Sequence, residues 1–125
     1  MNTSQVYAWL SAESTVTAAL GSPPRIYPVI APEGVSGSGG ASSWVTYLGA
    51  SGTPENTLGG FAGMDRVRVQ FDAYAATYED AKALSETIAA ALDARGFVVA
   101  WNGETYDLDA RKFRRSFDFE FFATR

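Results

Sequence analysis

The stretch DRVRVQFDAYAATYEDAKALSETIAAALDARG, residues 65–96, predicts a strand followed by a helix. Over residues 65–75 apolar and polar side chains alternate, which is typical of a strand with one buried face. Thr77 suits the N-cap of the helix with Asp80 three positions later, and Gly96 suits its end. One side of the expected helix is apolar because apolar residues recur every three or four positions, namely Ala81, Leu84, Ile88, Ala91 and Leu92.

The last stretch, RKFRRSFDFEFFATR (residues 111–125), predicts a second strand of the same sheet. Its alternation from residue 113 places four phenylalanines on one face, together with Arg115. We expect this strand to lie antiparallel to residues 65–75, with Arg66 opposite Glu120 and Arg68 opposite Asp118. Each opposed charge pair then contributes about 0.2–1 kcal/mol. The register leaves Arg115 opposite Phe71, so we expect the arginine to extend toward water at the sheet edge.

The same basic residues suggest a different use. Arg111, Lys112, Arg114 and Arg115 lie beside phenylalanines, and single-stranded nucleic-acid grooves combine basic and aromatic side chains. The formal net charge of −4 opposes a protein whose main task is to hold phosphate. We therefore favour the strand and predict no specific nucleic-acid binding.

Two further segments are expected to be regular. Residues 4–20 predict a helix broken near Glu13, with Ser14 as the N-cap of its second piece. Gly21 suits the end of that piece. Asn102–Gly103, between the apolar runs FVVAW and ETYDL, predicts a type I′ hairpin turn.

Short β-branched and aromatic runs at residues 25–30 and 44–50 predict the remaining strands. The expected fold class is α+β, a mostly antiparallel sheet of about four to five strands with helices packed on one face. We expect residues 1–125 to form a single domain.

Residues 33–43 and 51–64 predict two long loops, because the first is rich in Gly and Ser, the second is rich in Gly, and both lack periodicity. Loops of this length usually bind partners or stay flexible. We expect fast amide exchange in the isolated chain, and ordering against a neighbouring subunit or another partner. The residues expected to make these contacts are Glu33, Ser38, Glu55, Asn56 and Phe61.

The composition limits the chemistry that the chain can perform. None of its 125 residues is cysteine or histidine. This excludes disulfides, thiolate nucleophiles, Ser–His triads and zinc sites built from Cys or His. Asp107 and Asp109 could share a strand face and hold a divalent cation, but such sites usually have more oxygen ligands, so a solvated face is favoured. We predict no enzyme activity, no catalytic residue, no metal and no cofactor.

The order of motifs resembles the tail terminator proteins of long-tailed bacteriophages, also called tail completion or tail-to-head joining proteins. The similarity rests on TAALGSPPRIYP, a Gly-rich loop, WVTYLGAS, and RVRVQFDAYAATYEDAKALSETIAAALD. It covers nearly the whole chain, and its motifs are structural rather than catalytic.

The resemblance implies a virion protein that forms a hexameric ring on the head-proximal end of the tail tube. Such a ring ends tube polymerisation, joins tail to head, and lets DNA pass through its lumen. The implied partners are other copies of the chain, the major tail tube protein, and a head-completion or neck protein. The implied location is the virion tail, after assembly in the host cytoplasm.

No leader or apolar run of roughly 18–20 residues is present, so no membrane association is expected. A closed ring needs two different complementary patches on each subunit. We hypothesise that Glu79 and Asp80 contribute to one, and Arg111 and Lys112 to the other. Another neck or head-completion connector, or a small carboxylate-based enzyme, remains the alternative.

Overall fold

The computed structural model describes residues 3–36, 40–55 and 64–124. These residues form five strands and four helices. The strands are β1 (Ile26–Pro28), β2 (Ser43–Glu55), β3 (Met64–Ala75), β4 (Phe97–Asp107) and β5 (Lys112–Thr124). The helices are α1 (Ser4–Ser11), α2 (Ser14–Leu20), α3 (Glu33–Ser36) and α4 (Tyr78–Ala91).

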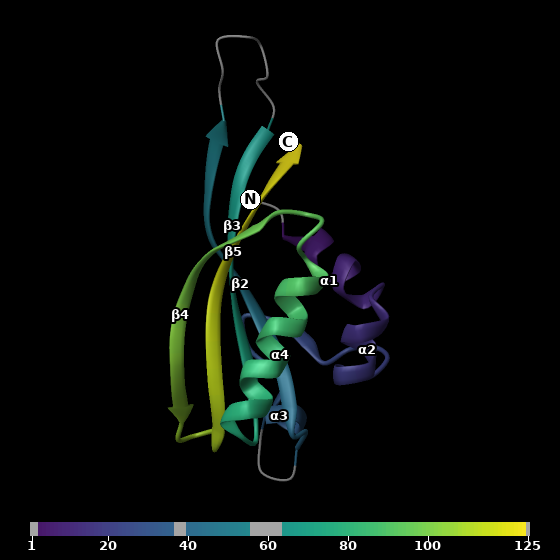
Figure 1. Cartoon of the computed structure of the whole chain (residues 1–125), viewed down its shortest axis with the longest axis vertical. Helices are drawn as coiled ribbons and strands as arrows, with labels where there is room; N and C mark the ends of the chain where they lie inside the picture. Colours follow the sequence, from purple (N-terminus) through teal and green to yellow (C-terminus); the bar gives the residue numbers. More distant parts are fainter. Residues whose placement is uncertain (1–2, 37–39, 56–63, 125) are drawn as a thin grey trace.

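The described strands form one sheet in the order β1-β2-β3-β5-β4. β1 runs parallel to β2, and the other neighbouring pairs are antiparallel. Helices α1, α2 and α4 cover one face of this sheet (Figure 1). We call the opposite face the open face. The predicted fold class is therefore confirmed.

The core lies between the sheet and these three helices. Alternate residues of β3 and β5 point toward the helices and are fully buried, as the strand alternation predicts. Burying a large apolar side chain contributes about 1.5–3 kcal/mol, so this layer dominates the stability. The helices and the two strands supply Val6, Leu10, Val16, Leu20, Leu84, Ile88, Leu92, Val67, Val69, Phe71, Phe117, Phe119 and Phe121.

β3 and β5 are antiparallel neighbours, as predicted, but the expected register was wrong by two residues. Arg68 lies opposite Glu120 rather than Asp118. Asp118 is diagonal to Arg68, and their side chains form an ion pair at 2.7 Å. A slip of two residues keeps each side chain on its own face and still pairs opposite charges, so the charge pattern could not decide between the registers. The observed register places Phe71 opposite Phe117, with their rings stacked at 5.2 Å.

Arg115 lies opposite Ala73, not Phe71, and this small neighbour leaves room for the arginine on the helix-covered face. Its guanidinium lies 4.3 Å from the ring centroid of Trp101. It forms ion pairs with Glu86 of α4 at 3.3 Å and Glu104 of β4 at 3.6 Å. The arginine therefore reaches the edge strand β4 and is neutralised there.

The predicted hairpin turn at Asn102–Gly103 was wrong. β4 continues through both residues, and the register with β5 shifts between Trp101 and Gly103. Gly103 has φ +94, so its conformational freedom serves a β-bulge instead of a turn. The connection to β5 comes later, where the Asp107 carboxylate accepts hydrogen bonds from the backbone N–H groups of Asp109 and Ala110.

Two of the loop boundaries also need correction. Residues 33–36, expected to be loop, form the short helix α3. Residues 51–55 extend β2 and Met64 begins β3, so only residues 56–63 of the second expected loop lie outside the described chain. The strand pairing of residues 52–55 with 64–67 explains the difference, because backbone hydrogen bonds do not require an apolar sequence.

The helix boundaries are largely as expected. The Thr77 hydroxyl accepts the Asp80 N–H at 3.1 Å, which confirms the predicted cap. The first helix is broken where predicted, but Glu13, not Ser14, occupies the N-cap position of α2. Gly96 lies beyond the end of α4, and a Cβ there would collide with the backbone carbonyl of Glu120. Glycine is thus required at this position by close packing on β5.

Candidate functional site: a hollow on the open face

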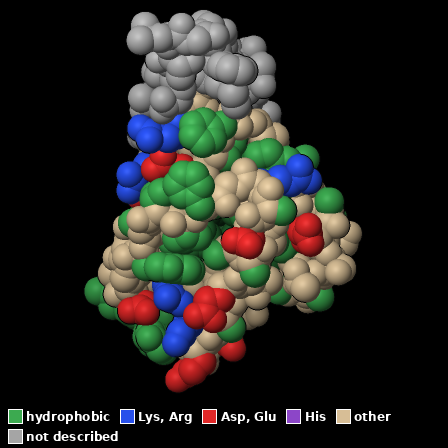
Figure 2. Space-filling view, turned by 45° about the horizontal axis from the view of Figure 1, so that its top comes forward, with side chains coloured by type: hydrophobic (Ala, Val, Ile, Leu, Met, Phe, Trp, Pro, Cys, Tyr) green, Lys and Arg blue, Asp and Glu red, His purple; other side chains and the backbone are tan. Residues whose placement is uncertain are grey.

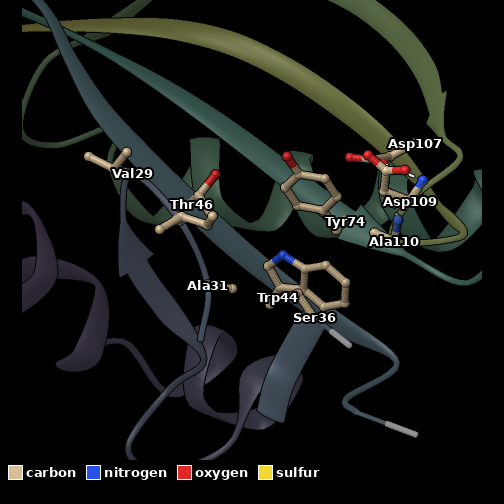
Figure 3. Close-up of a pocket in the computed structure, with 10 residues that line it drawn as sticks. Val29, Ala31, Ser36, Trp44, Thr46, Tyr74, Asp107, Asp109 and Ala110 are labelled. Carbon is tan, nitrogen blue, oxygen red and sulfur yellow. Dashed lines mark hydrogen bonds between the residues drawn. The ribbon is translucent and has the colours of Figure 1, made fainter. Parts of the chain in front are cut away.

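A hollow of about 540 Å³ lies on the open face, at the end of the sheet where β4 turns into β5. Figure 3 shows its side chains coming from the segment after β1, from β2 and β3, and from the β4–β5 turn. Its lining consists of Val29, Ile30, Ala31, Ser36, Trp44, Thr46, Tyr74, Asp107, Asp109 and Ala110.

The floor of the hollow is aromatic. Trp44 of β2 lies opposite Tyr74 of β3, and their rings stack at 5.0 Å with an interplanar angle of 17°. Trp44 is only 2% exposed, although it lies on the face away from α1, α2 and α4, where Ser36 of α3 lines the same hollow. The Lys112 ammonium is 5.9 Å from the Trp44 ring centroid, within the range of a cation–π contact. Burial raises the pKa of Tyr74, and a hydrogen bond with Arg114 acts in the opposite direction.

One wall of the hollow is aliphatic and unusually exposed. Val29 and Ile30 are 66% and 77% exposed. Val29 has φ +67, a conformation that costs a β-branched residue about 1–3 kcal/mol and often marks a functional position. Its N–H donates to the Tyr47 carbonyl at 2.8 Å, which holds the strained residue in place.

The opposite wall carries Asp107 and Asp109. Because the Asp107 carboxylate is occupied by two backbone N–H groups of the turn, its visible role is to shape that turn. Asp109 lies in the turn rather than on the strand where we expected it. Within the described residues, no three acidic side chains gather as they would around a metal ion. An aromatic floor, an aliphatic wall and an acidic wall can together hold an apolar side chain that has a cation beside it.

The predicted interface residues flank the same end of the molecule. Arg111 and Lys112 directly follow the acidic wall of the hollow. Glu79 and Asp80 lie in the first turn of α4, on the other side of the sheet. Asp80 also lines a second hollow of about 250 Å³ between α2 and α4. Among the described residues, neither Arg111 nor Lys112 forms an ion pair.

The predicted contact loops are only partly described. Glu33 is the first residue of α3 and is exposed, and Glu55 is the last residue of β2. Ser38, Asn56 and Phe61 lie outside the described residues.

Sequence analysis did not single out the aromatic and aliphatic residues of the hollow. A signal was present: Trp44 and Tyr74 have the opposite strand phase to the buried Val45 and Ala73. That phase places both rings on the face away from the helices.

The surface at this end is mixed in charge. Figure 2 shows acidic and basic side chains next to one another, with apolar side chains among them, toward the lower end of that view. Within the described part of the chain, none of the helices has the length and apolar character needed to cross a membrane.

Comparison with solved structures shows the same fold in two phage-related chains. A chain from the virion of a native gene transfer agent particle matches with a TM-score of 0.60 and 19% identity, covering 96% of this chain and 92% of that one. The structure of bacteriophage SPP1 gp17 protein matches with a TM-score of 0.55 and 14% identity, covering 98% of this chain and 88% of that one. No curated protein sequence matches the chain.

A family model gives the assignment that these low identities do not. The model described as tail completion protein gp17 matches residues 4–124, which is almost the whole chain. The chain therefore belongs to the tail completion protein gp17 family, whose members are structural proteins of the phage tail.

Proposed function

We propose that this protein forms a ring on the head-proximal end of the phage tail tube, where it ends tube polymerisation and joins the tail to the head. The match of the family model to residues 4–124 carries this proposal. The composition agrees with a structural role, since cysteine and histidine are absent and no acidic metal cluster occurs among the described residues. The partners are other copies of the chain, the tail tube protein and a head-completion or neck protein.

DNA passes through the lumen of this ring during ejection. The formal net charge of −4 favours sliding over retention, because tight DNA binding depends on many Lys and Arg contacts with phosphate. Arg66 and Arg68 form ion pairs with acids of β5, and Arg115 with Glu86 and Glu104, so these cations are already compensated within the fold.

The subunit contact in the ring joins two different patches of each chain. Arg111 and Lys112, beside the hollow, form one patch, and Glu79 and Asp80, at the start of α4, form the other. The Lys112 ammonium lies over Trp44 on the open face, whereas α4 covers the other face of the sheet, so a single chain can present both patches to different neighbours (Figure 1). Exposed charge pairs contribute only about 0–1 kcal/mol each, so we expect weak association in dilute solution and assembly on the tube end.

Electron microscopy of labelled tails tests the location. Because the chain has no cysteine, Thr15→Cys at an exposed position of α2 gives a single site for maleimide–gold. We expect gold at the head-proximal end of the tube in purified tails and at the head–tail joint in whole particles. Unsubstituted tails treated identically give the background. Gold at the distal tip, or along the tube, would contradict the proposal.

Reversing the basic patch should disrupt assembly without unfolding the chain. In Arg111→Glu/Lys112→Glu, only the Lys112–Trp44 contact is lost within the fold, at about 0.5–1 kcal/mol. We expect overlong tails or tails without heads, counted by electron microscopy. Arg95→Glu, at the opposite end of β4, is the control and should give normal particles. Normal tail length and head joining in the double variant would remove these residues from the interface.

A further inference from the structure

An exposed aromatic patch lies on the helix side of the edge strand β4. It consists of Tyr78, Trp101 and Tyr106, which are 40%, 45% and 46% exposed. Helix α4 packs on β3 and β5, and the side chains of β4 lie beyond this cover. The patch therefore lies at the surface, beside the edge strand β4, which pairs with β5 on one side only.

The patch is held rigidly from below. The rings of Trp101 and Phe117 are 5.0 Å apart, as are those of Tyr106 and Phe113. The Tyr78 hydroxyl donates to Glu104 at 3.2 Å. Rigid Trp and Tyr side chains dominate the energy of protein interfaces, because little side-chain entropy remains to be lost on binding.

The aliphatic wall of the hollow, Val29 and Ile30, has the complementary character on the open face. Both side chains are largely exposed at the rim of the hollow, and the backbone of Val29 is strained. They cannot act by extending the sheet, because Pro28 lacks an N–H and its carbonyl already accepts from Ile30 at 2.7 Å. Val29 and Ile30 can therefore contribute apolar surface to a contact.

The two surfaces overlap in their position along the strands. The Val29 N–H donates to the Tyr47 carbonyl, and Tyr47 lies opposite Phe71. Phe71 lies opposite Phe117, which lies opposite Trp101 of the patch. Rotation about a ring axis preserves height along that axis, so complementary patches of a ring subunit must lie at equal height. An axis roughly along the strands meets this condition for Val29 and Trp101.

We propose that Val29 and Ile30 of one copy pack against the aromatic patch of the next copy in the ring. This rests on the ring stated under the proposed function and adds the apolar centre of its subunit contact. The surrounding charges are complementary, since Glu79 and Glu86 beside the patch can meet Arg111 and Lys112 beside the hollow. Lys82 of α4 can likewise meet Asp109. An aliphatic wall against rigid aromatic rings, bordered by opposite charges, is the usual composition of an interface centre.

Cysteine crosslinking in a chain without native cysteine tests the contact. A phage whose own copy is deleted is supplied with Ile30→Cys/Trp101→Cys, and its tails are treated with a short bismaleimide. We expect a ladder of crosslinked multimers, at least about tenfold stronger than in a control pair, because only juxtaposed residues react. The control pair is Ile30→Cys/Ala90→Cys, with the second cysteine exposed further along α4. Each single variant should give no ladder.

The outcomes separate the contact from the ring. Circular dichroism melts first establish that the exposed substitutions leave the fold intact. If glutaraldehyde joins the chains on the tails but the 30/101 pair gives no more product than the control, the proposed contact is wrong and the proposed ring is unaffected. If the bismaleimide joins position 30 to the tube or neck protein instead, the second copy is not the occupant. If neither reagent joins two copies, both the ring and the contact fail.

Discussion

Replacing Phe119 by alanine should lower the free energy of unfolding by about 3–5 kcal/mol, the range measured for large aromatic residues in cores. Phe119 is fully buried and its ring lies 6.4 Å from that of Phe71 and 6.2 Å from that of Phe121. Truncation would leave a cavity between the sheet and the helices, since the surrounding rings cannot all move inward. The loss is large against the roughly 6–19 kcal/mol expected for a domain of this length.

The same strand offers a matched control. Phe122 is the same residue type three positions later, but it points to the open face and is 52% exposed. Phe122→Ala should cost about 1 kcal/mol or less, as surface substitutions usually do. Chemical denaturation of both variants, followed by circular dichroism, measures the two values. Equal losses would mean that the two faces of β5 are not divided into core and surface as the structure has them.

The sequence predicted best where one periodicity extended over many residues. β3 and the start of α4 were predicted to within one residue, because the alternation and the helical spacing each extend over many residues. The end of α4 was not, since the helix ends at Ala91 rather than just before Gly96. The pairing of β3 with β5 was also predicted, from charges that match across the strands. The register was not, because a shift of two residues preserves the faces and still places Arg68 opposite an acid, Glu120 in place of Asp118.

The predictions that were wrong rest on short sequence motifs that occur in two different structural contexts. Asn102–Gly103 is the preferred sequence of a tight turn, yet the positive φ of Gly103 here serves a bulge inside β4. Gly96 suits a helix stop, but its absent side chain is needed for the close approach of Glu120. Only the tertiary contacts, which lie far apart in sequence, distinguish these uses.

The candidate site was harder to predict than the fold. The hollow combines residues from three separate parts of the chain, and its wall depends on the positive φ of Val29, which no propensity suggests for a β-branched residue. Trp44 is both buried and part of this surface, so burial alone would have assigned it to the core. The basic pair Arg111 and Lys112 was singled out from charge alone, and the structure places it beside the hollow.

Deleting the gene for this protein should abolish the joining of tails to heads. Under the proposed function, no ring would then stop the addition of tube subunits, so tails should exceed their normal length and vary widely. The surface that docks to the head would be absent at the same time. Because the joint depends on many contacts made together, we expect the infectious titre to fall by at least about a thousandfold.

Complementation makes this deletion experiment specific. Supply of the unsubstituted chain should restore normal tail length and titre, and Phe122→Ala should restore them nearly as well if the open face near that residue makes no essential contact. Phe119→Ala should restore them poorly at elevated temperature. Its free energy of unfolding is lower by about 3–5 kcal/mol, so the variant populates its unfolded state. Electron microscopy gives the tail lengths and the fraction of heads with tails. Deletion tails of normal length, joined to heads as usual, would overturn the proposed function, because a protein that ends the tube and joins it to the head cannot be absent without consequence.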